Sequence, residues 1–268
     1  MHRFWATTAF AAIAAALSAP ASAQETPARE NSDDVVVTAQ RREQSAQDVG
    51  IALSVIGTDE LKQRGITNVN GIQDATPSLE IEPAFGGGAA QFRLRGVGFQ
   101  DYATNNAPTV GVYVNEVAYP VPVMTQGLIF DMARVEVLRG PQGTLYGRNT
   151  TGGAVNFVTN RPTDAFSAGA SVEYGRFDWL VGEGYVSGPV ADGVKLRLSA
   201  ATQQGGAYQH NRTTGEKIGD ANRWGTRFLL EVAPTGSGFS ALLDAHYGRD
   251  KSEMTGLYLL TPLNTKGG

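Results

Sequence analysis

The chain of 268 residues contains no cysteine and only three histidines. The missing cysteines exclude a disulfide scaffold, a thiolate metal site and a cysteine nucleophile. An excess of positive charge is also missing, because 22 lysines and arginines against 26 aspartates and glutamates give a formal net charge of −4. A nucleic-acid-binding protein needs a basic stripe, so nucleic acid is not an expected partner. No apolar run reaches the roughly 20 residues that a membrane-spanning helix needs.

Glycine, by contrast, is abundant at 33 residues, alongside 9% aromatic and 18% charged residues. This composition is typical of β-structure with many turns and unlike the core of a helical enzyme. The length allows one large or two modest domains. Composition alone therefore indicates a secreted or envelope protein rich in β-structure.

Residues 1–23 have the three parts of a secretory signal peptide. A short basic region at positions 2–3 precedes a mostly apolar stretch at 4–17, and A-S-A at 21–23 is a small-x-small cleavage pattern. The alternative is a membrane anchor, for which the apolar stretch is too short. We expect export, with a mature chain that begins at Gln24.

A β-prone run follows a polar tether, and its residues are Asp34, Val35, Val36, Val37, Thr38 and Ala39. Three consecutive valines and a threonine favour an extended strand in an otherwise irregular setting. A strand without a sheet of its own would pair readily with the exposed strand edge of another protein. The alternative is that this run is the first strand of the domain that follows.

The most distinctive stretch covers residues 134–162, R-V-E-V-L-R-G-P-Q-G-T-L-Y-G-R-N-T-T-G-G-A-V-N-F-V-T-N-R-P. Its pattern predicts a strand over 134–138, a tight turn rich in glycine and proline, and a second strand over 154–159. Arg134 and Glu136 would share one face of the first strand and could form an ion pair. An ordinary glycine-rich loop between strands is the alternative interpretation.

Four residues of that turn are expected to have separate functions. Gly140 permits a positive φ, and Pro141 fixes its own φ. Gly143 and Gly147 would let two backbone segments approach each other closely.

The region before this stretch mixes short strands, short helices and loops. We expect a strand over 51–56 and a helix over 59–64, with Thr58 as the N-cap and Gly65 as the terminator. Further along the chain we expect a helical turn at 68–75 and strands at 79–82, 92–96, 110–114 and 117–119. The glycines at 86–88 and 96–98 match neither a Walker A motif nor a dinucleotide fingerprint, so nucleotide binding is not expected.

Beyond residue 165 apolar and polar residues alternate with a period of two. The alternation predicts strands at 166–175, 194–201, 223–232 and 239–248, a weaker strand at 179–187 and a sixth at 255–260. Tight turns at 192–193 and 236–238 alternate with a long polar loop at 203–221. Strands of about ten residues with aromatic ends are typical of a transmembrane β-barrel, with a soluble β-sandwich as the alternative.

Together these segments resemble the TonB-dependent outer-membrane receptors. The stretch 134–162 is similar to the end of their plug domain, and Q-D-V-G-I-A-L-S-V-I-G-T-D-E-L-K-Q-R-G-I-T-N-V resembles its start. The resemblance implies an α+β plug domain, a small mixed sheet with short helices, followed by the first antiparallel strands of an incomplete 22-stranded transmembrane β-barrel. Five or six strands cannot close a barrel, so an N-terminal fragment is expected.

The implied organisation has four parts. A signal peptide at 1–23 precedes a periplasmic tether at 24–44 with the TonB box at 34–39, a plug domain at 45–162, and the start of the barrel at 163–268. The polar loop 203–221 would then be extracellular.

The resemblance also implies partners and sites. TonB would bind residues 34–39 from the periplasm and, with ExbB and ExbD, would supply energy from the inner-membrane proton gradient. Arg95 and Arg139 would lock the plug to acidic residues of the barrel wall. Loops of the plug would face the substrate through Phe85, Phe99, Tyr102, Asn105, Tyr119 and Met124. The expected function is active uptake of a scarce substrate across the outer membrane. The barrel strands would contact the lipid of that membrane. In this family the substrate is most often a ferric siderophore. Cobalamin, haem and glycans are alternatives.

Two other classes of function are less consistent with the sequence. An enzyme is not expected, because His210 and His246 lack a serine-elbow or H-E-x-x-H context and no carboxylate pair stands out. No catalytic residue, metal ligand or cofactor is therefore assigned. A passive channel or an adhesin would have no use for a TonB box and a plug.

Overall fold

The computed structural model describes residues 36–39, 41–42, 44–83, 90–98, 107–125 and 127–254. Several predictions concern residues outside these ranges: the signal peptide, Asp34 and Val35 of the proposed TonB box, and the strand at 255–260. Four of the six proposed substrate contacts, Phe85, Phe99, Tyr102 and Asn105, also lie outside the described residues.

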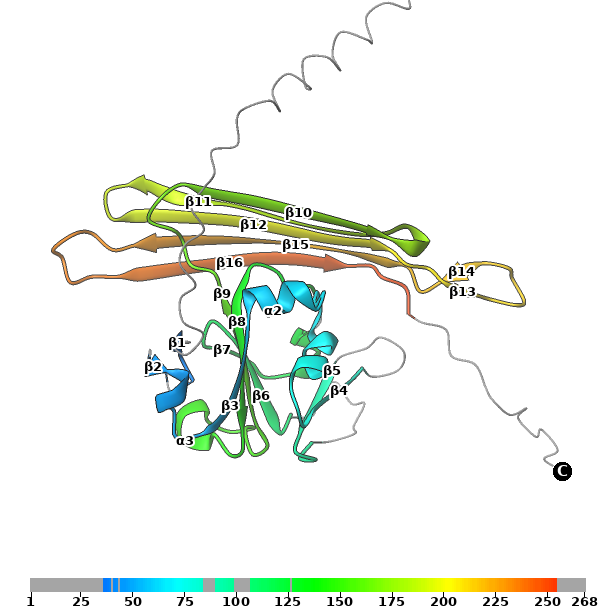
Figure 1. The fold of residues 1–268 in the computed structure, drawn as a ribbon, viewed down its shortest axis with the longest axis horizontal. Coiled ribbons are helices and arrows are strands. Elements are labelled where there is room, and N and C mark those ends of the chain that lie inside the picture. The colour runs from blue at the N-terminus through cyan, green and yellow to red at the C-terminus, as the bar shows by residue number, and fades with distance from the viewer. Residues whose placement is uncertain are drawn as a thin grey trace, which may run out of the picture. The chain divides into compact units, whose positions relative to one another are not determined.

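A mixed five-stranded sheet forms the centre of the first half of the chain (Figure 1), with strand order β3-β8-β9-β6-β7. Strands β6 and β9 pair in parallel, whereas the other neighbours are antiparallel. The strands are β3 (Ala52–Gly57), β6 (Val110–Val114), β7 (Val117–Tyr119), β8 (Met132–Arg139) and β9 (Gly153–Thr159). The small mixed sheet predicted from the sequence is confirmed.

The stretch 134–162 forms the antiparallel β8–β9 hairpin, with a single helical turn, α3 (Gly143–Tyr146), between its strands. Gly140 has the expected positive φ, 95°. The expectation for Gly143 and Gly147 is wrong, because a Cβ at either position would meet no heavy atom within 4 Å. The close approach is at Gly153, where an added Cβ would lie 2.2 Å from the carbonyl oxygen of Leu138.

The predicted short helix is α2 (Thr58–Gln63), and Gly65, whose φ is 62°, follows the C-cap Arg64 as the expected terminator. Its cap differs from the prediction. Gly57 is the N-cap, and the Thr58 hydroxyl instead lies 2.8 Å from the carbonyl oxygen of Met132. Thr58 therefore ties the start of α2 to β8, a contact between residues 74 positions apart that local sequence cannot show.

A core fills the space between the mixed sheet and the elements that pack on it. Its fully buried members include Ile56, Ile72, Leu94 and Val155. The packing elements are α2, the 3₁₀ helix η2 (Val69–Ala75), and the two-stranded sheet of β4 (Leu79–Pro83) and β5 (Ala90–Leu94). Two further 3₁₀ turns are η1 (Ala46–Asp48) and η3 (Pro122–Thr125).

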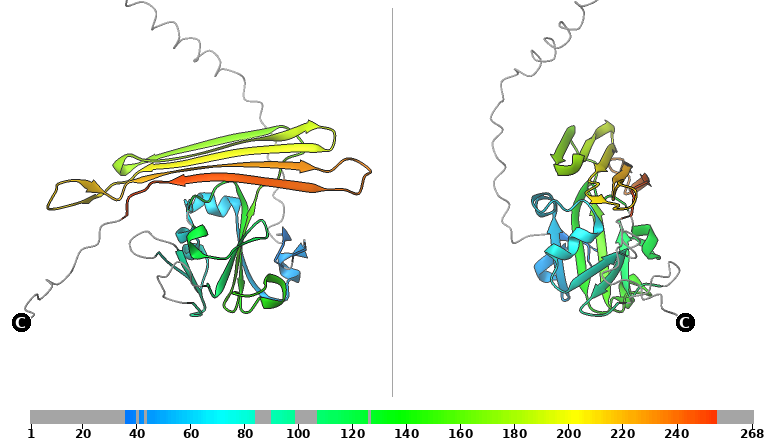
Figure 2. Two further views of the ribbon diagram at one scale, coloured as in Figure 1. Left: turned by 180° about the vertical axis from the view of Figure 1, so that it is seen from behind. Right: turned by 90° about the vertical axis from the view of Figure 1, so that its right-hand side faces the viewer.

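The second half of the chain forms a five-stranded antiparallel sheet, here called the wall sheet, with order β10-β11-β12-β15-β16. Its strands are β10 (Ser167–Gly175), β11 (Trp179–Ala191), β12 (Val194–Gly205), β15 (Ala221–Val232) and β16 (Ala241–Asp250). Figure 2 shows these strands as one uninterrupted layer. The strand expected to be weak, β11, has 13 residues and is the longest of the five.

Connections in the wall sheet agree only partly with the prediction. The tight turns form at Gly193 (φ 66°) and at Gly236 (φ 76°), as expected. The segment 203–221, predicted as a long polar loop, contains the end of β12 and a small hairpin of β13 (Gln209–His210) and β14 (Lys217–Ile218). A further 3₁₀ turn, η4 (Arg176–Asp178), joins β10 to β11.

The two faces of the wall sheet have opposite character, as the alternation predicts. One face exposes apolar side chains, among them Phe166 at 77% and Val172 at 73%. The other face buries polar ones, including Arg197, Ser199 and Gln203. Leu229 is an exception, an apolar residue buried on the polar face. Among the described residues, no helix is both long and apolar enough to cross a membrane.

Candidate functional site

The described part of the proposed TonB box is not a free strand. β1 (Val36–Val37) pairs antiparallel with β2 (Gln44–Ser45), and the side chains of Val37 and Ala39 are fully buried. The expectation of a strand without a sheet is therefore wrong for these residues. They belong to a second hydrophobic cluster, which also contains Val49, Tyr113, Leu138, Tyr146 and Ala154.

A buried carboxylate holds the middle of this segment. Glu136 on β8 is fully buried, and its Oε1 accepts a hydrogen bond of 2.8 Å from the backbone N–H of Thr38. The expected pair with Arg134 is present, with Nε 2.6 Å from Oε1. Asn156 on β9 donates to Oε2 at 3.3 Å. Three neighbours thus compensate one buried negative charge, as a desolvated carboxylate requires.

A tyrosine holds the end of the segment. The hydroxyl of Tyr146, on α3, donates to the carbonyl oxygen of Ala39 at 3.0 Å. Its ring packs edge-on against Tyr113, with 4.8 Å between centroids, and the guanidinium of Arg41 lies 5.5 Å from the ring centre. Burial raises the pKa of Tyr146 to about 12, and the nearby Glu136 adds to the rise. The hydroxyl is therefore a neutral donor at ordinary pH.

In the part of the chain that the structure describes, the two arginines proposed as a plug–wall lock form no ion pair with acidic residues of the wall sheet. Arg139 donates to the hydroxyl of Ser54 on β3. Arg95 is exposed, in the left-handed region at φ 53°. The lock stays a prediction for both residues.

Another pair joins the first half of the chain to the wall sheet. Asp131 lies just before β8, and its carboxylate accepts from Arg197 of β12, with Nε 2.7 Å from Oδ2. The exposed fractions of the two side chains are 2% and 5%. The backbone N–H of Asp131 also donates to Glu183 of β11 at 2.9 Å. Sequence reasoning missed this contact, although the inward position of Arg197 on its strand was a usable signal.

Three more contacts between the first half of the chain and the wall sheet lie near the Asp131–Arg197 pair. Arg227 on β15 donates to the carbonyl oxygen of Phe130 at 3.2 Å, and its guanidinium stacks over the Phe130 ring at 4.9 Å. Asn115, in the β6–β7 turn, donates to Asp244 of β16 at 2.7 Å. Asn115 has a φ of 47°, so this turn uses the left-handed conformation. The wall sheet therefore meets both the start of β8 and the β6–β7 turn.

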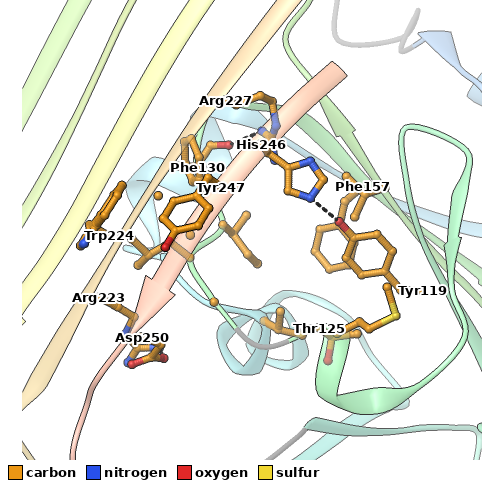
Figure 3. Close-up of a pocket in the computed structure, with 18 of the residues that line it drawn as sticks. Tyr119, Thr125, Phe130, Phe157, Arg223, Trp224, Arg227, His246, Tyr247 and Asp250 are labelled. Atoms are coloured by element: carbon orange, nitrogen blue, oxygen red, sulfur yellow. Dashed lines mark hydrogen bonds and ion pairs between the residues drawn. The ribbon is translucent and has the colours of Figure 1, made fainter. Parts of the chain in front are cut away.

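A groove of about 390 Å³ lies between the mixed sheet and the wall strands β15 and β16 (Figure 3). Tyr119 and Met124, two of the six proposed substrate contacts, line it. The Tyr119 hydroxyl lies 3.3 Å from Nε2 of His246. Arg223 and Arg227 line the wall side, and both have a buried Nε without a hydrogen-bond partner. The groove thus combines aromatic surface with two arginines, each of which also lies 3.9 Å from a wall-sheet carboxylate, Asp250 for Arg223 and Asp244 for Arg227.

The described residues show no group of three or more histidine, cysteine, aspartate or glutamate side chains that could hold a metal ion. His246 has Asp244 and Tyr119 as its polar neighbours, at 3.7 and 3.3 Å. This arrangement resembles a structural bridge more than a nucleophile with its base, because the tyrosine hydroxyl is a weak nucleophile.

The sequence of residues 45–154 matches the TonB-dependent Receptor Plug Domain family. The pesticin receptor of Yersinia pestis is 32% identical over 177 residues, which cover 65% of this chain and 26% of the receptor. The vitamin B12 transporter BtuB of Vibrio vulnificus is 26% identical over 223 residues, 81% of this chain and 35% of the transporter.

Solved structures agree with the sequence matches. The ferric yersiniabactin uptake receptor FyuA from Yersinia pestis aligns with a TM-score of 0.65 at 28% identity, over 74% of this chain and 31% of the receptor. The pyoverdine receptor FpvA from Pseudomonas aeruginosa, at 18% identity, shares the fold with a TM-score of 0.64, over 82% of this chain and 31% of the receptor.

The chain belongs to the TonB-dependent receptors. It carries their plug domain, built on the mixed sheet, followed by antiparallel strands of a barrel wall. It spans between about a quarter and a third of the length of the relatives described above.

Proposed function

We propose that the chain is part of an outer-membrane receptor that takes up a scarce substrate actively. TonB binds residues 34–39 from the periplasm and, with ExbB and ExbD, transmits energy from the inner-membrane proton gradient. The observation that carries this proposal is a plug domain joined directly to wall strands, with a β-prone segment at its N-terminal side. A passive channel or an adhesin would require neither feature.

The proposed substrate is a ferric siderophore. Relatives named as receptors for ferric yersiniabactin and pyoverdine support this class. The groove beside Tyr119 supports it independently, since aromatic surface and arginine donors suit a large anionic chelate. The alternative is cobalamin, which the similarity to a vitamin B12 transporter favours, or haem or a glycan.

The location follows from the same proposal. A signal peptide over 1–23 exports the chain, and the exposed apolar face of the wall sheet, with Val172 and Tyr174, contacts outer-membrane lipid. The substrate-facing residues are then Tyr119 and Met124, with Phe85, Phe99, Tyr102 and Asn105. Arg95 and Arg139 remain proposed to lock the plug to acidic residues of the barrel.

Capture by the periplasmic domain of TonB tests the coupling assignment. The complete receptor, extracted from outer membranes in detergent, is compared with its Val36→Pro variant. A proline removes a backbone donor and disfavours the strand that TonB would pair with, so we expect capture to fall at least tenfold. The matched control is Ala28→Pro, in the tether and outside the segment. Equal capture of the Val36→Pro variant and the unaltered receptor would overturn the assignment.

Uptake of iron tests the substrate class. Cells that lack other iron receptors are supplied with single ferric siderophores, haem or cobalamin, with and without TonB. We expect growth on a ferric siderophore only when both this receptor and TonB are present. Growth that persists without TonB would indicate a passive channel, whereas dependence on cobalamin alone would replace the siderophore by the alternative substrate.

A further inference from the structure

The wall sheet holds the plug through one row of inward-facing side chains. Strand pairing places Arg197 of β12, Leu229 of β15 and Asp244 of β16 side by side in this row. Arg197 binds Asp131 of the plug at one end of the row, and Asp244 binds Asn115 at the other. We call the first contact the anchor and the second the latch.

The anchor side is tightly closed. The side chains of Asp131 and Arg197 are 2% and 5% exposed, and Glu183 accepts from the backbone N–H of Asp131. The neighbouring Phe130 ring packs directly on Gly225, where an added Cβ would lie 3.0 Å from Cε1 of the ring. Separation on this side would leave a buried charge unpaired and an empty space behind the ring, and both are costly.

The latch side is built differently. Asn115 is tied to the plug by Thr159, whose N–H donates to its Oδ1 at 3.0 Å and whose hydroxyl oxygen lies 2.9 Å from its Nδ2. One hydrogen bond of 2.7 Å joins Asn115 to Oδ2 of Asp244. The Asp244 side chain is 22% exposed, so this contact is less deeply buried than the anchor. When the plug moves away from the wall on this side, the bond that breaks is therefore the one between Asn115 and Asp244.

Asp244 has a replacement partner on the wall itself. Its Oδ1 lies 3.9 Å from Nε of Arg227 and 3.7 Å from Nδ1 of His246. In the described part of the chain, Oδ1 of Asp244 and Nε of Arg227 are both buried without a hydrogen-bond partner. Two atoms of oppositely charged groups thus lie just beyond hydrogen-bond distance, and each is costly to leave unsatisfied. Loss of the bond to Asn115 frees Asp244 to close this gap.

We propose that Asp244 is a positioning residue that exchanges partners, holding Asn115 while the latch is closed and pairing with Arg227 when the latch opens. This inference rests on the proposed function, because an open latch widens the groove beside Tyr119 for passage of the substrate. Opening also separates the Tyr119 hydroxyl from His246, 3.3 Å away across the same groove (Figure 3). The exchange keeps the cost of opening low, since no buried charge is left without a partner. The anchor stays closed and acts as the pivot.

Pulsed electron paramagnetic resonance on pairs of spin labels measures opening without TonB or substrate. This chain has no cysteine that would compete for the label, and any cysteine elsewhere in the complete receptor is replaced by serine. Val117→Cys on β7 and Leu243→Cys on β16 report on the latch, at side chains that are 64% and 54% exposed. Gln63→Cys on α2 and Leu198→Cys on β12 report on the anchor side. We expect opening to add a longer distance to the first pair and to leave the second pair unchanged.

Three substitutions shift the latch between its states. Tyr119→Phe removes the bridge to β16 without altering Asp244, and it should raise the open population about threefold. Asn115→Gly, added to it, removes the latch bond, accommodates the φ of 47° and should raise the open population about tenfold further. Arg227→Gln, added to Tyr119→Phe instead, keeps a donor for the Phe130 carbonyl but removes the replacement cation. The open population should then fall about threefold.

The sign of the Arg227→Gln effect separates two roles of this arginine. If Arg227 only held the Phe130 carbonyl, its loss would loosen the plug, and the open population would rise instead of falling. A rise would therefore overturn the exchange. Equal lengthening of both label pairs in any variant would overturn the anchor as a pivot. Arg212→Gln, in the exposed β13–β14 hairpin, is the matched control and should alter neither pair.

Covalent tethers test the link to transport. A short, cleavable bifunctional thiol reagent joins Asn115→Cys to Asp244→Cys across the latch. In a second variant it joins Thr67→Cys to Gln203→Cys on β12, the strand of the anchor, where the native side chains are 3.2 Å apart. The measurement is TonB-dependent uptake of radioactive iron, supplied as the ferric siderophore that supports growth in the test above. We expect the latch tether to stop uptake and its cleavage to restore it, whereas the anchor tether should leave uptake largely intact.

The outcomes distinguish this inference from the proposed function. Uptake that continues with the latch tethered, or that stops equally with either tether, would overturn the role of the latch in transport. Absence of TonB-dependent uptake in the unaltered receptor would instead refute the proposed function. The label distances would still test the partner exchange in that case, because they require neither TonB nor substrate.

Discussion

Asp131 and Arg197 form a buried ion pair across the boundary between the plug and the wall sheet, with Nε of Arg197 2.7 Å from Oδ2 of Asp131. The two residues are 66 positions apart in the chain. The negative partner lies on the plug and the positive one on the wall, the reverse of the lock predicted for Arg95 and Arg139. The pair fixes the start of β8, the strand whose middle holds Glu136.

Removal of one partner should be costly. Asp131→Ala leaves Arg197 buried without its counter-charge, and breaking a buried pair in this way typically costs about 3–5 kcal/mol. We expect the plug of the complete Asp131→Ala receptor to unfold or be released at a lower urea concentration than the plug of the unaltered receptor. The measurement is the urea midpoint at which the plug becomes sensitive to protease. Asp59→Ala, which removes an exposed carboxylate of α2, is the control and should change the midpoint little. An unchanged urea midpoint for Asp131→Ala would show that the Asp131–Arg197 pair adds no stability.

Gly153 is the glycine whose replacement the hairpin should tolerate least. Its φ is 149°, and a Cβ there would lie 2.2 Å from the carbonyl oxygen of Leu138 and 2.5 Å from Cδ2 of Leu94. Gly153→Ala should therefore destabilise the plug by on the order of 1–3 kcal/mol or more through strain and displaced neighbours. Gly50→Ala meets no atom within 4 Å and serves as the control. The measurement is the thermal midpoint of each variant, and equal midpoints would contradict the geometry.

Local patterns in the sequence predicted most of the strands. Strands β6 and β7 match their expected bounds, because alternation and a following turn are encoded within a few residues. β11 gave a weak signal because glycines at 182, 184 and 188 interrupt its alternation, yet pairing with β10 and β12 along its length makes it a strand. Tertiary pairing thus outweighed a poor local pattern.

Sequence patterns could not predict contacts between distant segments. The N–H of Thr38 meets Glu136, which is 98 positions away, and no periodicity links the two residues. The prediction of Thr58 as the N-cap was wrong for the same reason, because its hydroxyl donates to the carbonyl oxygen of Met132 instead of capping its own helix. Alternation placed Arg197 on the polar face but could not reveal that the acid opposite it was Asp131. Each miss concerns a polar side chain whose partner only the folded chain provides.

The hydrogen bond from the Tyr146 hydroxyl to the carbonyl oxygen of Ala39 should respond to alkaline pH. Burial raises the folded-state pKa of this phenol to about 12, above the ordinary value of about 10 in an unfolded chain. The neutral hydroxyl therefore contributes stability that is fully present below about pH 10 and is lost as the pH rises through about 12. Tyrosinate absorbance should show one tyrosine that ionises near pH 12 and disappears in the Tyr146→Phe variant. If the difference in absorbance between the unaltered protein and the Tyr146→Phe variant developed near pH 10, that result would contradict the burial of this hydroxyl.

The two faces of β10 allow a test of which side meets lipid. Val172 points to the exposed apolar face at 73%, whereas its neighbour Ser171 lies on the opposite face, where it lines a groove beside the plug. An arginine on the lipid side of a transmembrane barrel costs about 2–4 kcal/mol at the bilayer midplane, whereas a lumen position carries no such cost. Val172→Arg should therefore reduce assembly of the complete receptor into lipid vesicles, measured by the heat-sensitive mobility of the folded barrel on gels. Ser171→Arg, one residue away on the same strand, should assemble almost normally. If both variants assembled equally well, the exposed face of the wall sheet would not be the lipid face, and the outer-membrane assignment of these strands would lose its physical basis.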